Sequence, residues 1–192
     1  MLQKVEVKTV KKVKYVCIYG ASSDLIDRAY LDESYALGRA VANQGMAIVY
    51  GGGATGVMGQ AARGAKSADG YVLGIAPRYF DLEGILFKEC DEFIFTDTMR
   101  ERKGMLEDYA DAVVVAPGGL GTMDEFFEVF TLRQVGQSSM PIVILNVCGC
   151  YDTLLQMIDE FIERKFADPS VRELFKVCTT ADEAAKYIKD NV

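Results

Sequence analysis

The chain has 192 residues, half of them hydrophobic, a formal net charge of −7 and a pI near 4.7. Its length is most simply that of one α/β domain, and its acidic balance argues against nucleic acid as a partner, because binding a phosphate backbone needs a basic field. No apolar run approaches the ~20 residues that cross a membrane, and the charged N-terminus lacks a signal-peptide core. We therefore expect a cytoplasmic protein with no membrane partner.

The N-terminus carries a run of lysines at Lys4, Lys8, Lys11, Lys12 and Lys14. Charge runs are usually solvated, so we predict a basic arm at 1–13 on a single domain that spans 1–192.

The five cysteines are odd in number and lack metal-finger spacing, which predicts free thiols in a reducing compartment. Cys17 is expected to pack inside a strand. Cys148-Gly-Cys150 is the one suggestive pair, but without histidine or further cysteines nearby no metal site is predicted.

Apolar periodicity alternates along the chain between strand-like and helix-like segments. Strands are predicted at 14–19, 47–50, 71–75, 92–95, 112–116, 142–145 and 176–178. Helices are predicted between them at 27–44, 56–67, 98–109, 122–135, 151–164 and 180–190. Several strands are nearly continuous apolar runs, as in a parallel sheet covered on both faces. We predict an α/β fold: a doubly wound, mainly parallel sheet of about seven strands with helices on both faces.

Three predicted strands end in turns of small residues: Gly20–Ser23, Gly51–Gly59 and Pro117–Thr122. A single glycine turn is often only a tight connection. In a doubly wound sheet, however, all three open at the carboxyl edge, where their amides can converge on one ligand. The third turn also opens a helix, whose first free N–H groups favour an anion such as phosphate.

Neither of the longer turns continues into the Gly-Lys-Ser/Thr of a Walker loop. The turn at Gly51–Gly56 superficially suits a dinucleotide fingerprint, but that fingerprint belongs after the first strand, where the sequence is Gly-Ala-Ser-Ser. A mononucleotide is therefore the expected ligand.

Three cations, Arg100, Arg102 and Lys103, stand near the start of the helix predicted at 98–109. Such a group is usually a solvated face, but here it follows a strand on the edge that holds the turns. Arg102 can offer a fork to a phosphate or carboxylate and Lys103 a point charge. A helical rotation of roughly 100° per residue predicts that they serve different groups.

Glu125 has two interpretations. Thr122-Met-Asp-Glu125 matches a capping box, in which Thr122 caps the helix and Glu125 folds back onto its amide. Alternatively, Glu125 acts on whatever the preceding turn holds. Its place in the first helical turn predicts a lowered pKa, because the helix dipole stabilises the carboxylate. An ionised Glu125 would suit base or charge-stabilising work.

The chain contains no histidine, which excludes Ser-His and Cys-His triads. Phosphate-binding turns with one well-placed carboxylate fit cleavage at the anomeric carbon of a nucleotide. The transition state of that reaction resembles an oxocarbenium ion, which a carboxylate can stabilise while it activates water. This chemistry needs no metal, and we predict no cofactor.

Three motifs together resemble the LONELY GUY (LOG) family, long labelled lysine decarboxylase-like, and the resemblance runs from about Tyr15 to Ile188. They are Gly51-Gly52-Gly53 with Gly56-x-Met58-Gly59, then Met99-x-x-Arg102-Lys103, and Pro117-Gly118-Gly119-x-Gly121-Thr122-x-x-Glu125. The resemblance implies a Rossmann-like homodimer, with a higher homo-oligomer as the alternative. It also implies hydrolysis of cytokinin riboside 5′-monophosphates, and often AMP, to free base and ribose 5-phosphate.

Residue by residue, the resemblance implies that Arg102 and Glu125 form the catalytic pair. The implied substrate-binding residues are Gly20, Ser22, Ser23, Gly51, Gly52, Gly53, Met99, Lys103, Gly118, Gly119, Gly121, Thr122 and Glu128. The combined motifs shift the interpretation of Glu125 toward catalysis. Asp124 or a bound water is expected to protonate the leaving base.

The chain departs from the family pattern at three positions. Arg100 stands where histidine is common, and Cys148 and Cys150 stand where Asp and Tyr are frequent. The decarboxylase label gains no support, because no lysine has a convincing pyridoxal-phosphate context. Two alternatives stay open: a non-catalytic carrier of a nucleotide or of the molybdenum-cofactor pterin, and a scaffold with a vestigial site.

Overall fold

The computed structural model describes residues 13–192, so the predicted basic arm lies almost wholly outside the described residues. Seven strands form one sheet in the order β4-β3-β2-β1-β5-β6-β7, and every neighbouring pair is parallel. The strands are β1 (Tyr15–Tyr19), β2 (Ala47–Tyr50), β3 (Val72–Pro77), β4 (Glu92–Thr96), β5 (Ala112–Val115), β6 (Ile142–Leu145) and β7 (Lys176–Cys178).

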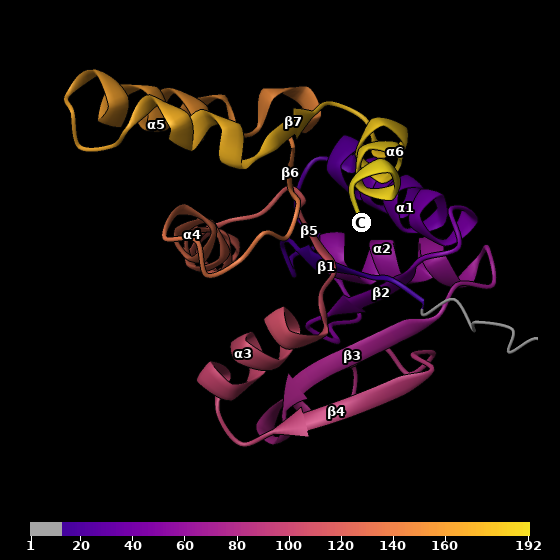
Figure 1. The fold of residues 1–192 in the computed structure, drawn as a ribbon. Helices are drawn as coiled ribbons and strands as arrows, with labels where there is room; N and C mark the ends of the chain where they lie inside the picture. Colours follow the sequence, from indigo (N-terminus) through magenta and orange to yellow (C-terminus); the bar gives the residue numbers. More distant parts are fainter. Residues whose placement is uncertain (1–12) are drawn as a thin grey trace, which may run out of the picture.

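Six α-helices lie on the two faces of this sheet (Figure 1). They are α1 (Arg28–Asn43), α2 (Gly56–Lys66), α3 (Met99–Tyr109), α4 (Leu120–Gln134), α5 (Asp152–Glu163) and α6 (Ala181–Asn191). The predicted doubly wound α/β fold, Rossmann-like in its parallel sheet and crossover helices, is therefore confirmed.

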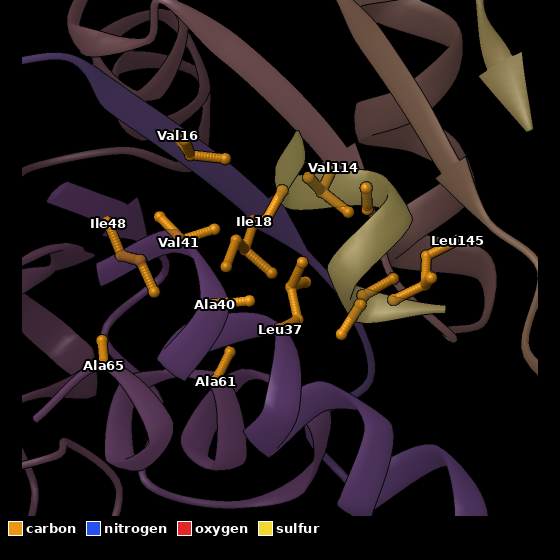
Figure 2. Close-up of a cluster of buried hydrophobic side chains, with 14 of the residues drawn as sticks. Val16, Ile18, Leu37, Ala40, Val41, Ile48, Ala61, Ala65, Val114 and Leu145 are labelled. Carbon is orange, nitrogen blue, oxygen red and sulfur yellow. The ribbon is translucent and has the colours of Figure 1, made fainter. Parts of the chain in front are cut away.

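Side chains alternate along each strand, so each face of the sheet has its own apolar core. Val16 and Ile18 of β1 pack under α1, α2 and α6, beside Leu37 and Ala61 (Figure 2). Cys17 and Tyr19 point to the other face and join the core beneath α3, α4 and α5. The prediction that Cys17 is a packing residue is confirmed, since its side chain is fully buried.

The strand order reverses at β1, which is the switch point of the sheet. It adds β2, β3 and β4 on one side of β1 and then places β5, β6 and β7 on the other. Tyr19 at the end of β1 pairs with Val115 of β5. The turns that follow these two strands diverge to opposite faces, which leaves a crevice between them where open α/β sheets bind ligands.

The predicted strands and helices all exist, most with bounds within one or two residues. Helix α4 begins at Leu120 and not at Thr122, a difference that matters for the site. Three short 3₁₀ helices, Arg78–Phe80, Val147–Gly149 and Pro169–Leu174, were not predicted. None of the helices in residues 13–192 has the length and apolar character required to span a bilayer.

Candidate active site

The turns after β1 and β5 form the floor of a cleft at the switch point. The amide of Ala21 donates to the carbonyl of Pro117 at 3.0 Å, which joins the two turns. The cleft has a volume of about 490 Å³. Its lining includes the predicted site residues Gly20, Ser22, Ser23, Met99, Arg102, Lys103, Gly119, Gly121, Thr122 and Glu125.

The N-terminus of α4 opens into this cleft without a side-chain cap. Gly119 is the N-cap residue and no side chain in the described structure accepts from the first turn. Gly119 and Gly121 are exposed, so their amides are available to an anion at the positive end of the helix. The open helix start lies where the glycine turn predicted it, and the binding of an anion there stays a prediction.

The capping box predicted for Thr122 and Glu125 is wrong. Thr122 lies inside the first turn of α4 and is 3% exposed. Its hydroxyl packs so close to Gly118 that a Cβ there would collide with it. Gly118 therefore shapes the turn from beneath, and it does not line the cleft.

Glu125 forms a buried ion pair with Arg102 of α3. Arg102 Nη1 donates to Glu125 Oε1 at 2.9 Å, and Arg102 Nε donates to the carbonyl of Ile75 at 3.3 Å. The two residues are 6% and 9% exposed. Removing one partner of such a pair leaves an uncompensated buried charge, at a cost of about 3–5 kcal/mol. The fork predicted for Arg102 is therefore engaged with a carboxylate of the protein.

A capping box holds the start of α3 and so helps to aim Arg102. The side chain of Thr98 accepts from the amide of Glu101 at 3.2 Å, while Glu101 Oε2 accepts from the amide of Thr98 at 3.3 Å. The Thr-x-x-Glu pattern of this capping box is visible in the sequence. Its contribution to the site, which is to fix the helix turn that carries Arg102, becomes clear only from the structure.

Burial raises the pKa of Glu125 above its ordinary value, and the Arg102 guanidinium opposes this shift. The predicted lowering by the helix dipole is therefore wrong in direction. Desolvation of the carboxylate outweighs the favourable charges around it. Glu125 is a carboxylate in a poorly solvated place, where its proton affinity is increased.

Lys103 serves a different group from Arg102, as the helical rotation predicted. Its ammonium lies 3.0 Å from Asp124 Oδ2 and 2.6 Å from Glu128 Oε2. These two carboxylates raise the pKa of Lys103, Glu128 contributing most. Lys103 and Asp124 line the cleft, whereas Glu128 does not. The structure thus places Glu128 behind Lys103, where it holds the lysine, and gives it no direct exposure to the cleft.

The glycine turn after β2 approaches the same pair from the other side. A Cβ at Gly51 would collide with Arg102 Nη2, so only glycine leaves room for the guanidinium. Gly51 and Gly53 line a second cavity that adjoins the cleft. Gly52, with φ of +76°, lines neither; it faces Phe93 and Leu86.

Helix α2, which follows this turn, is closed at its N-terminus by the protein itself. Asp24 Oδ1 accepts from the amide of Gly56 at 2.7 Å, and the carbonyl of Ala21 accepts from Met58 at 3.3 Å. Thr55 Oγ1 donates to the carbonyl of Ser22 at 2.6 Å. These bonds fix the turn that carries Ser22 and Ser23 onto α2.

Sequence reasoning missed several residues of this region, among them Met58 and Asp24. Met58 lines both cavities, and it was singled out only as part of a motif. Asp24 caps α2 from 32 positions away. An acidic residue just after Ser22-Ser23 was the one signal for it, and nothing in the sequence names its partner.

The turn after β6 supports the cleft from beneath. The hydroxyl of Tyr151 donates to the carbonyl of Ala116 at 2.6 Å, directly before the Pro117–Thr122 turn. Cys148 in this turn is exposed with φ of +49°. All five cysteines are free thiols, as predicted. Residues 13–192 contain no cluster of three or more metal-ligating side chains.

Fold and site together define a Rossmann-like α/β protein in which an uncapped helix N-terminus lies beside a buried Arg–Glu pair. A family model described as "Possible lysine decarboxylase" matches residues 58–188. The cytokinin riboside 5′-monophosphate phosphoribohydrolase LOG3 of Arabidopsis thaliana is 31% identical over 179 residues, covering 93% of this chain and 83% of that protein. A Mycobacterium tuberculosis protein of the same activity name is 32% identical, with 89% and 91% covered.

The chain belongs to this LOG family, as its three motifs predicted. Among solved structures, the molybdenum cofactor binding protein of Rippkaea orientalis superimposes with a TM-score of 0.71 at 21% identity, covering 93% of this chain and 97% of that one. The moco carrier protein of Chlamydomonas reinhardtii has the same score and identity. At this identity the likeness establishes the fold alone.

Proposed function

We propose that this chain hydrolyses the N-glycosidic bond of adenosine 5′-monophosphates, releasing the free base and ribose 5-phosphate. The observation that carries the proposal is the buried Arg102–Glu125 pair, joined at 2.9 Å, in the same cleft as the uncapped N-terminus of α4. An anion held at that helix would bring the rest of a nucleotide against the pair.

In the proposed reaction the phosphate binds the amides of Gly119 and Gly121, with Thr122 fixing the turn. Glu125 accepts a proton from a water molecule whose oxygen attacks C1′ as the C1′–N bond breaks. The bonding electrons leave with the base, which takes a proton from a bound water or, when its carboxyl is protonated, from Asp124. Arg102 orients Glu125 and, with it, balances the charge that develops on the sugar.

We assign the remaining cleft residues to substrate contact. Gly20, Ser22 and Ser23 form the wall on the β1 side, and Met99 and Lys103 form the wall on the α3 side. The relatives' names supply the substrate class, which is a cytokinin riboside 5′-monophosphate. AMP is the simplest member of that chemical class and the simplest test of the site.

A carrier of a phosphorylated pterin is the second candidate, because several of the matching solved structures are named as molybdenum cofactor proteins. The Arg102–Glu125 pair favours the enzyme. Storage of a phosphorylated ligand needs the cradle alone, whereas hydrolysis also needs a carboxylate that can activate water beside it. A vestigial site would gain nothing from the pair, because packed apolar side chains in its place are often at least as stable.

Base release decides among these candidates. The protein is incubated with AMP and with N6-isopentenyladenosine 5′-monophosphate, and the free base is measured by chromatography. Hydrolysis by the wild type and its loss in Glu125→Gln would support the enzyme. Tight retention of a pterin without base release from either nucleotide would overturn it in favour of the carrier.

We further propose that 1–192 acts as one domain in the cytoplasm and assembles as a homodimer, with a higher homo-oligomer as the alternative. Two large apolar side chains beside the cleft, Leu25 and Leu120, are 97% and 92% exposed, which supports a partner at this end of the molecule. Light scattering checks the dimer as a mass of twice 21.1 kDa. A mass of one chain at micromolar concentration would contradict it.

A further inference from the structure

A second cavity, of about 390 Å³, lies on the other side of Arg102 from the cleft. Ser22, Met58 and Arg102 line both hollows. The Arg102 guanidinium therefore stands between them, with Nη1 turned to Glu125 and Nη2 turned to Gly51. A ligand centred on the Arg102–Glu125 pair can reach both.

The far wall of the second cavity is the connection between β3 and β4, which is fastened to the glycine turn after β2. The amide of Ala54 donates to the carbonyl of Ile85 at 2.9 Å, and that of Phe87 donates to the carbonyl of Gly52 at 2.9 Å. Gly53 and Leu86 form an isolated antiparallel bridge. Because backbone hydrogen bonds hold this wall in place, its side chains can vary without loss of the wall's position.

The two hollows differ in chemistry. The cleft is lined by Lys103, Asp124 and Glu125 besides Arg102. In the second cavity Arg102 is the one charged lining residue, and Phe80, Ile85 and Leu86 supply apolar walls. A phosphate is accommodated at the α4 end, whereas an apolar group gains by leaving water at the other end.

We propose that the second cavity holds the base end of the nucleotide, and that Ile85 and Leu86 are specificity-determining residues that select an apolar substituent on the exocyclic amine. This inference rests on the proposed function for the ligand's identity. Phosphate in the cradle and sugar at the Arg102–Glu125 pair leave the base to cross toward Met58. The β3–β4 connection then sets how large and how apolar the base end can be.

Ile85→Asp tests the proposal, with Leu82→Asp as its matched control. Ile85 lines the cavity and is 40% exposed, while Leu82 stands in the same connection, is 61% exposed and lines neither hollow. Each change is made in the Glu125→Gln background so that nucleotides stay intact. Isothermal titration then measures binding of AMP and of N6-isopentenyladenosine 5′-monophosphate.

We expect Ile85→Asp to weaken binding of the isopentenyl nucleotide by at least ~10-fold, the scale of losing a methylene or two from an apolar pocket, and to change AMP binding by less than ~3-fold. Leu82→Asp should change neither. Ile85→Ala should act in the same direction as Ile85→Asp, by a smaller factor.

An unchanged ratio of the two affinities in both Ile85 variants would overturn the assignment, as would an equal loss in Leu82→Asp. This failure is distinct from failure of the proposed function. A protein that discriminates the nucleotides but releases no base retains the cavity assignment and loses the enzymatic one. A protein that hydrolyses AMP but ignores Ile85 shows the reverse.

Discussion

Helices α2 and α4 begin in the same way but end up with different roles. Each follows a parallel strand through a glycine turn and points its positive end toward the carboxyl edge of the sheet. At α2, Asp24 Oδ1 accepts from the Gly56 amide at 2.7 Å. At α4, no side chain in the described structure caps the first turn, and Gly119 and Gly121 are exposed.

The two helix N-termini differ because Asp24, from the loop after β1, caps α2, whereas no side chain in the described structure caps α4. Asp24 supplies to α2 the negative charge that a helix N-terminus favours, so α2 holds the β1 turn in place and has no need of a ligand. The α4 terminus leaves the amides of its first turn without a side-chain partner in the described structure, and we propose that a ligand binds them. Of two turns that are alike in sequence, the protein thus closes one with its own carboxylate and leaves the other open.

The strongest test of this comparison is Glu125→Gln, which removes the base on α4 and leaves the turn intact. We expect kcat to fall at least ~100-fold, typical for loss of a key electrostatic group. The loss of stability should stay below the about 3–5 kcal/mol of deleting one partner of a buried ion pair, because the amide oxygen of glutamine still accepts a hydrogen bond from Arg102. Steady-state kinetics and thermal unfolding measure both. Glu163→Gln on α5, the same change at an exposed position, should leave kcat unaltered; a small effect of Glu125→Gln would contradict the assigned role.

The pH dependence of kcat reports whether Glu125 acts as the base. Burial raises the pKa of Glu125 above the ordinary glutamate value, so the carboxyl stays protonated, and the reaction slow, up to a higher pH than it would with a solvated glutamate. Activity should rise with pH through a midpoint above that of a solvated glutamate. Asp124→Asn should keep this acidic limb, and Glu125→Gln should lose it from its residual rate. A limb at the ordinary glutamate value would show that burial does not control the base.

The open cradle itself is tested by Gly121→Val. A Cβ at Gly121 meets no protein atom within 4 Å, so the fold tolerates the change while bulk is added where the anion binds. We expect KM to rise at least ~10-fold, the scale of one lost hydrogen bond to a charged group, and inhibition by inorganic phosphate to weaken in parallel.

Gly104→Val is the matched control, since Gly104 lies on α3, has equally open space around its Cβ and does not line the cleft. Both variants should unfold at nearly the wild-type temperature. Equal KM values for the two would remove the distinction between α4 and the rest of the surface.

The sequence predicts the sheet well because its strands are buried runs. Ala47–Tyr50 and Ile142–Leu145 are apolar throughout, and their observed bounds are those predicted. The start of α4 was mispredicted for a local reason. Thr122 matched a capping pattern, but Gly119 adopts the N-cap conformation and Thr122 turns inward against Gly118. A local sequence pattern contains no information about the tertiary packing of the Thr122 hydroxyl against Gly118.

The sequence predicted which residues form the candidate site, but it did not predict which of them contact one another. Strand order and helix starts place Arg102 and Glu125 at one edge, but their 2.9 Å pair spans 23 residues and depends on how α3 packs beside α4. The same holds for the sign of the Glu125 pKa shift. The dipole is a local property that the sequence reveals, whereas the burial that outweighs it arises from tertiary packing.

The smallest effect is expected from Asp24→Ala, compared with Asp27→Ala. Both carboxylates accept from a helix-start amide, Asp24 at Gly56 and Asp27 at Ala29, so each change should cost about 1 kcal/mol of stability. Of these two carboxylates, only Asp24 also holds the Ser22–Ser23 turn on α2. Its loss should therefore raise KM by ~2-fold to ~3-fold, which corresponds to the free energy of one weak hydrogen bond, while kcat stays unchanged. Chemical denaturation and steady-state kinetics measure these two quantities. If Asp24→Ala instead tightened phosphate binding, the Gly56 amide would be a competent anion site, and the contrast between α2 and α4 would depend on this one carboxylate and not on the shapes of the two turns.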